Sequence, residues 1–126
     1  MDISFTDREL DVMAVLWRKG SGTVAEVRDA LDDTFAYTTV LTVLRTLEEK
    51  GFITHLTEGR THRYLPAVTP DLAGQSALSR VLDKIFAGSP DLLLTQLVSD
   101  QNLDTNDLRR LRKLLDDRLA QRKKER

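Results

Sequence analysis

Three short helical patterns are followed directly by two β-rich segments, and all five lie within residues 1–68. The first two patterns open with a threonine and carry a glutamate three positions later, which is the capping box of a helix N-terminus. The capping pairs are Thr6 with Glu9 and Thr23 with Glu26. The third pattern covers roughly residues 37–50, and Gly51 then supplies a left-handed cap. Three helices followed by two strands is the element order of a winged helix-turn-helix.

Each helical pattern has an apolar side in which residues recur every three or four positions. We expect the buried faces to consist of Leu10, Met13, Ala14 and Trp17, then Val24, Val27 and Leu31, then Val40, Leu44 and Leu47. The segments FITHLT and THRYLPAV flank the short turn EGR and predict a β-hairpin. The sequence therefore predicts a winged helix-turn-helix domain over residues 1–68.

The outer face of the third helix is built mainly from threonines. It carries Thr38, Thr42, Arg45, Thr46 and Glu49, with Thr39 at the edge. Threonine is a mediocre helix former, and a face made only for solubility would more often carry Glu–Lys pairs. Its short side chain offers a hydroxyl and a methyl to base edges, while an arginine can pair with guanine or hold a phosphate. We therefore favour a helix lying in the DNA major groove over a threonine-rich solvated surface.

The hairpin turn places Arg60 at its tip, with His62 and Arg63 following in the second strand. A charged hairpin that only protects the sheet edges is the alternative. We favour a wing whose Arg60 reaches phosphates or the minor groove, and rank Arg63 lower because strand alternation places it opposite His62. His55 and His62 can face one another, but neighbouring residues supply no convincing third and fourth metal ligands. No metal or other cofactor is predicted.

The net charge of the whole chain is −1. Residues 1–68 hold eight Lys and Arg side chains against eleven Asp and Glu, which gives −3. Basic residues must therefore be concentrated locally if this domain binds DNA, because phosphate neutralisation supplies much of the affinity. Lys50 and the N-terminus of the second helix near Thr23 are expected to add contacts with the DNA backbone.

Several classes of protein are disfavoured by what the chain lacks. There is no cysteine, which excludes disulfides and metal–thiolate sites. No apolar run approaches the roughly 20 residues of a membrane-spanning helix, and the acidic start lacks a signal-peptide core, so a cytoplasmic protein is expected. No phosphate-binding loop or nucleophile elbow is recognisable, so an enzyme is not predicted.

Residues 69–126 read as helices, with Pro70 opening the first, Ser89 capping the second and the last covering about 105–123. These helices carry more apolar side chains than they can bury among themselves. The remaining apolar side chains either pack against the first domain or form a dimer interface. We favour a helical dimerisation domain, since small helical segments rarely stabilise themselves and a DNA-binding domain with few basic residues needs a second half-site. The interface residues expected are Val81, Leu82, Ile85, Phe86, Leu93, Leu94, Leu97, Leu108, Leu111 and Leu115.

The stretches AYTTVLTVLRTLEEKGFI and EGRTHRYLPAV resemble the penicillinase-repressor family (BlaI/MecI, which includes the CopY repressors). TDRELDVMAVLW and TVAEVRDAL resemble the first two helices of that family, so residues 5–68 match closely and 69–122 in pattern. The resemblance implies a homodimeric winged-helix repressor of antibiotic-resistance or copper-handling genes that binds inverted-repeat operators, often with TACA/TGTA half-sites. The DNA-binding positions it implies are Tyr37, Thr38, Thr39, Thr42, Arg45, Thr46 and, in the wing, Arg60.

The resemblance also implies a way of inactivating the repressor. In the antibiotic branch, a membrane sensor with a zinc-protease domain detects a β-lactam, and the repressor is cut at an Asn–Phe bond. The aligned pair here is Gln96–Leu97. The copper branch senses metal through cysteines in the tail, and this chain has none. A repressor controlled by a small ligand and a winged helix used only for protein interaction are the remaining alternatives.

Overall fold

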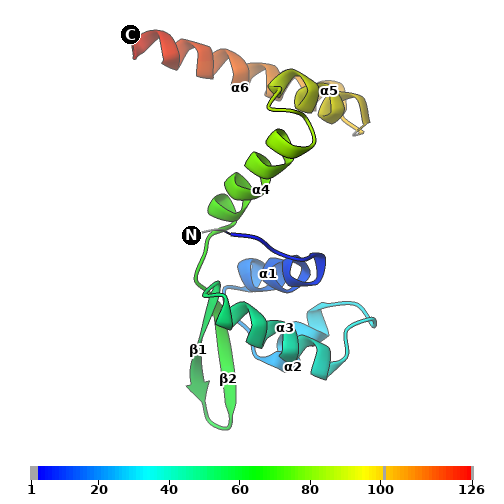
Figure 1. The fold of residues 1–126 in the computed structure, drawn as a ribbon, viewed down its shortest axis with the longest axis vertical. Coiled ribbons are helices and arrows are strands. Elements are labelled where there is room, and N and C mark those ends of the chain that lie inside the picture. The colour runs from blue at the N-terminus through cyan, green and yellow to red at the C-terminus, as the bar shows by residue number, and fades with distance from the viewer. Residues whose placement is uncertain (1–2, 101, 126) are drawn as a thin grey trace. The chain divides into compact units, whose positions relative to one another are not determined.

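The computed structural model describes residues 3–100 and 102–125. The elements follow in the order α1 (Asp7–Lys19), α2 (Val24–Ala30), α3 (Tyr37–Glu49), β1 (Ile53–Glu58), β2 (Thr61–Pro66), α4 (Pro70–Lys84), α5 (Pro90–Asp100) and α6 (Thr105–Lys124) (Figure 1). The fold is mainly helical with one small antiparallel hairpin, as the sequence predicted.

The chain divides into two compact units, Met1–Ser79 and Arg80–Arg126, and the division falls inside α4. The first part of α4 belongs to the first unit because Ala73 is buried in its core and the Ser76 hydroxyl donates to the carbonyl of Ile3 at 2.9 Å. The functional boundary expected after residue 68 stays a prediction.

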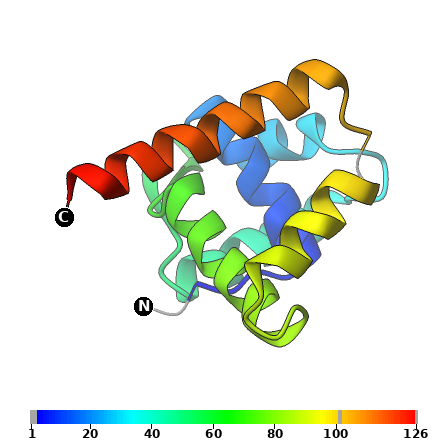
Figure 2. The ribbon, with the colours of Figure 1, turned by 90° about the horizontal axis from the view of Figure 1, so that it is seen from above.

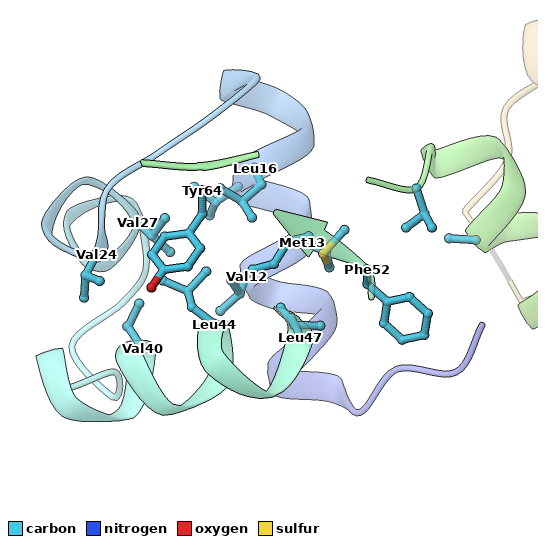
Figure 3. Close-up of a cluster of buried hydrophobic side chains, with 14 of the residues drawn as sticks. Val12, Met13, Leu16, Val24, Val27, Val40, Leu44, Leu47, Phe52 and Tyr64 are labelled. Carbon is cyan, nitrogen blue, oxygen red and sulfur yellow. The ribbon is translucent and has the colours of Figure 1, made fainter. Parts of the chain in front are cut away.

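The core of the first unit lies where α1, α2 and α3 converge on the hairpin (Figure 3). Val40, Leu44 and Leu47 of α3 are fully buried, as their spacing predicted. Figure 3 shows them pointing toward side chains of α1 and α2, with the ring of Tyr64 from β2 between the helices. One side of α3 is thus packed in the core, and the opposite side faces the solvent.

The buried side of α1 differs from the predicted one. Leu10 and Ala14 are exposed, and the buried residues are Glu9, Val12, Met13, Val15 and Leu16. The carboxylate of Glu9 accepts from the backbone N–H of Thr6 at 2.7 Å and from Lys50 Nζ at 2.8 and 3.0 Å. Burial raises the pKa of Glu9, but the hydrogen bonds from Lys50 and Thr6 outweigh it and hold the pKa below its ordinary value.

The hairpin is closed by Gly59 and Arg60, between the paired residues Glu58 and Thr61. Gly59 has a φ of 63°, which suits the first central position of a tight hairpin turn. At the other end, Gly22 pairs with Tyr64 through backbone hydrogen bonds of 3.0 and 2.8 Å. Gly22 also packs closely on α2, since a Cβ at this position would lie 3.0 Å from Val27 Cγ2 and would require that side chain to shift.

The second unit comprises the end of α4 with α5 and α6. Figure 2 shows α6 as one uninterrupted helix. Asp104 and Asp107 form its capping box. Among residues 80–100 and 102–125, no side chain is buried. Within the described ranges, no helix combines the length and the apolar character needed to cross a membrane.

Candidate nucleic-acid interface

The side of α3 that faces away from the core carries the predicted threonines. Thr38, Thr42 and Arg45 are exposed, whereas Thr39 and Thr46 are half-buried at the edges of this surface. The Thr42 hydroxyl donates to the backbone carbonyl of Thr38 at 2.9 Å, and its oxygen can still accept a hydrogen bond from a ligand. The result is a narrow ridge of short side chains with one long cation.

A groove of about 310 Å³ lies between this ridge and the hairpin. Tyr37 and Arg45 line it from α3, and Arg60 and His62 line it from the hairpin. Three of the predicted DNA-binding residues therefore share one groove. A second hollow, of about 350 Å³, is lined by Arg8, Thr38, Thr39, Thr42 and Val43. Thr46 lines neither hollow.

The two histidines face one another, as their places on paired strands suggested. The rings of His55 and His62 stack with centroids 4.1 Å apart and planes 8° apart. His55 Nδ1 lies 2.5 Å from a carboxylate oxygen of Glu48 on α3. In the part of the chain that the structure describes, no cluster of three or more His, Cys, Asp or Glu side chains is arranged to hold a metal ion. The stacked histidines therefore join the two strands of the hairpin, and the contact between His55 and Glu48 joins the hairpin to α3.

Arg63 forms ion pairs with two acidic residues of the first unit. Its guanidinium donates to both carboxylate oxygens of Glu26, at 3.2 and 2.9 Å, and to Glu58 at 2.5 Å. Hydrogen bonds from Arg63 and Thr23 lower the pKa of Glu26 to about 2. The hydrogen bonds to Glu58 and Glu26 raise the pKa of Arg63 above its ordinary value. Arg63 thus braces the hairpin against α2.

Two groups that were expected to contact DNA phosphates, Lys50 and the N-terminus of α2, interact with carboxylates of this chain instead. The Lys50 amino group bridges both carboxylate oxygens of Glu9, so its charge is already paired. At the N-terminus of α2, the Glu26 carboxylate accepts from the backbone N–H of Thr23 at 3.3 Å. A phosphate placed there would meet a carboxylate, so the structure gives no support to this helix end as a phosphate site.

Two arginines near the start of α3 were missed by the sequence reasoning. The guanidinium carbon of Arg8 lies 5.4 Å from the centroid of the Phe35 ring, and that of Arg28 lies 5.8 Å from the Tyr37 ring. The sequence shows the two aromatic residues, Phe35 and Tyr37, but the spacing of residues along the chain does not show which arginines pack against them. Arg8 thus places positive charge beside α3, whereas the charge of Arg28 is paired with Asp29 at 3.1 Å.

The comparisons with known proteins agree with these features. Residues 5–117 match the family model described as penicillinase repressor. The chain is 27% identical over 122 residues to the penicillinase repressor of Bacillus licheniformis, which covers 95% of this chain and 94% of that protein. It is 43% identical over 63 residues to the transcriptional regulator BlaI of Mycobacterium tuberculosis (strain ATCC 25618 / H37Rv), covering 48% of this chain and 46% of that protein.

One solved structure resembles the first unit. The solution structure of the DNA-binding domain of the repressor BlaI superposes with a TM-score of 0.51 and 33% identity. The match covers 56% of this chain and 88% of that domain. The resemblance indicated by the sequence motifs is thereby confirmed.

Proposed function

The chain belongs to the penicillinase repressor family and is a BlaI-like transcriptional repressor with a winged-helix DNA-binding domain, and we propose that it acts as a homodimer on an inverted-repeat operator. The observation that carries this proposal is the division of α3 into two sides. Val40, Leu44 and Leu47 are fully buried, while Thr38, Thr42 and Arg45 are exposed. A helix anchored in this way can present its outer side to base edges without moving.

In this proposal α3 lies in the major groove. Its contacts come from Tyr37, Thr38, Thr39, Thr42, Arg45 and Thr46, with Arg60 added by the wing. The threonine methyl groups suit contact with thymine methyls, and Arg45 suits bidentate pairing with a guanine. Arg60 stands exposed at the hairpin tip, where it can follow the phosphates of an adjacent backbone.

Homodimerisation is assigned to the second unit. Its apolar residues are exposed or only half-buried in the single chain, and they include Val81, Leu82, Ile85, Phe86, Leu93, Leu94, Leu97, Leu108, Leu111 and Leu115. An exposed apolar surface on this scale favours association with a matching surface. A second copy supplies one and also provides the second reading head that an inverted-repeat operator requires.

We further propose that the repressor acts in the cytoplasm on genes of antibiotic-resistance type and that a membrane sensor metalloprotease inactivates it. The Gln96–Leu97 bond lies inside α5, so a protease must first unwind that helix locally to reach it. Cutting there separates α6 from the rest of the chain. A dimer that loses this interface also loses bivalent binding, and each head is left with weak affinity for a single half-site.

Random-site selection with the full-length chain, followed by a gel-shift titration, tests the proposal. We expect enrichment of an inverted repeat and binding at a stoichiometry of two chains per duplex. Recovery of sequences with no common motif would favour the alternative of a winged helix used only for protein interaction.

A ligand-gated regulator is the second candidate, and one feature favours it. An open hollow of about 570 Å³ runs along α6, where Leu103, Leu111 and Leu114 lie beside the ion pairs Arg110–Asp107 and Lys113–Asp117. Such a surface can accept an uncharged apolar ligand, and it can equally be covered by a dimer partner. Thermal unfolding with a panel of small apolar compounds separates the two, since a bound ligand raises the melting temperature and a dimer face does not respond.

A further inference from the structure

The exposed ridge of α3 has a hollow on each flank. Tyr37, Leu41, Arg45 and Glu48 line the one shared with the hairpin, and Thr38, Thr39, Thr42 and Val43 line the one shared with Arg8 of α1. At about 100° per residue the two sets fall on opposite flanks of the exposed face of the helix. Only the hairpin flank contains a cation that the sequence had assigned to DNA binding.

Arg8 is placed to act on the second flank. It lies in the first turn of α1, its side chain is exposed, and its guanidinium carbon stands 5.4 Å from the centroid of the buried Phe35 ring. The ring face attracts the cation and limits where it can go. Within the described ranges Arg8 forms no ion pair with a carboxylate, unlike Arg63 and Lys50. Its charge is therefore available to a ligand.

The dimensions of DNA determine what that ligand is. The major groove is about 12 Å wide, and an α-helix with its side chains is about 10–12 Å across. A helix seated in the groove consequently has a sugar–phosphate backbone along each flank. If one backbone passes the hairpin and Arg60, the other passes the hollow beside Arg8.

We propose that Arg8 binds a phosphate of the DNA strand that runs along the α1 flank of α3, opposite the strand that Arg60 follows. This inference rests on the proposed function. The hydroxyl groups of Thr38 and Thr39 line the same hollow and are able to donate to the same phosphate. Arg8 and Arg60 then hold the helix from both sides, which fixes its depth in the groove without reading any base.

The test is a salt titration of operator binding with the full-length chain, using a duplex obtained by random-site selection. Because a bound dimer carries two Arg8 side chains, Arg8→Gln is expected to lower affinity about 60-fold at 0.1 M salt and to reduce the slope of log K against log salt by about 1.8. The selected sequence should not change, because a phosphate contact carries no sequence information. Arg8→Lys keeps the charge and should retain most of the slope.

Arg18→Gln, at the other end of α1, is the matched control and should leave the slope unaltered. A wild-type slope and affinity for Arg8→Gln on a selective operator would overturn the Arg8 contact alone. Equal loss of affinity in Arg8→Gln and Arg8→Lys, without a change in slope, would also overturn it and assign Arg8 to packing on Phe35. Wild-type protein that binds no duplex would overturn both this inference and the proposed function.

Discussion

Arg63 in β2 donates to both carboxylate oxygens of Glu26 in the first turn of α2, at 3.2 and 2.9 Å. The two residues stand 37 positions apart, and their bidentate pair joins the hairpin to the helix that precedes α3. The angle of the wing relative to the reading helix therefore depends partly on this contact. Several expected outcomes follow from it and from the packing of α3.

Arg63→Ala and Glu26→Ala are each expected to lower the melting temperature, because each leaves the other charge without its partner. The double variant should lose less than the sum of the two single losses, since the contact between Arg63 and Glu26 is removed in all three variants. Differential scanning calorimetry of the four proteins measures this coupling. Additive losses would mean that Arg63 and Glu26 act independently.

The ion pair between Arg63 and Glu26 predicts that stability depends on pH. The pKa of Glu26 is lowered from an ordinary 4.5 to about 2 in the folded state, so its contribution to stability is present above about pH 4.5. That contribution is lost as the pH falls toward about 2. The difference in melting temperature between wild type and Glu26→Gln should therefore be largest near neutral pH and should shrink below pH 4.5. A difference that stays constant down to about pH 2 would contradict the role of the carboxylate.

Leu44 and Thr42 lie on opposite sides of α3 and predict opposite kinds of defect. Leu44→Ala empties space in the core and should cost about 2–5 kcal/mol of unfolding free energy, measured by urea denaturation. Thr42→Ala should leave the unfolding free energy within about 0.5 kcal/mol of wild type, because Thr42 is exposed. It should nevertheless weaken operator binding through loss of the methyl and hydroxyl contacts. Normal operator binding by Thr42→Ala would remove this position from the interface.

Arg45→Ala tests the arginine on the outer face of α3. Operator binding should weaken by about 1–3 kcal/mol, and discrimination at a single base pair should relax, because a bidentate contact to guanine is lost. Fluorescence anisotropy with the selected duplex and its point variants gives both quantities. Circular dichroism confirms that the variant remains folded. Unchanged affinity and unchanged discrimination together would exclude Arg45 from base reading.

Deletion of residues 99–126 tests the assignment of dimerisation. The shortened chain lacks α6, and it should remain folded because every buried side chain among the described residues precedes residue 74. We expect sedimentation velocity to report a monomer, with operator affinity reduced through the loss of bivalency. A dimer of the shortened chain would show that α6 is dispensable for dimerisation and that apolar residues before residue 99 are sufficient.

The sequence by itself determined where helices and turns begin and end. The capping boxes at Thr6 and Thr23 both form, Gly51 adopts a φ of 84°, and the hairpin turns at Gly59. These features depend on hydrogen bonds and backbone angles that span only a few residues, so local chemistry fixes them. The buried side of α3 followed for the same reason, since its apolar residues repeat at the helical period.

Only the tertiary structure decided which charged side chains of the first unit are paired with one another and which can bind DNA. The buried carboxylate of Glu9 is paired with Lys50, which lies 41 positions away in the sequence. The helical period alone had predicted that Leu10 and Ala14 would be buried, and both are exposed. Arg63 is paired with Glu26, whereas Arg8 rests on Phe35 with its charge unpaired by any described carboxylate. An ion pair between distant residues depends on how the helices pack, and the energy of burying a charge depends on whether that partner arrives.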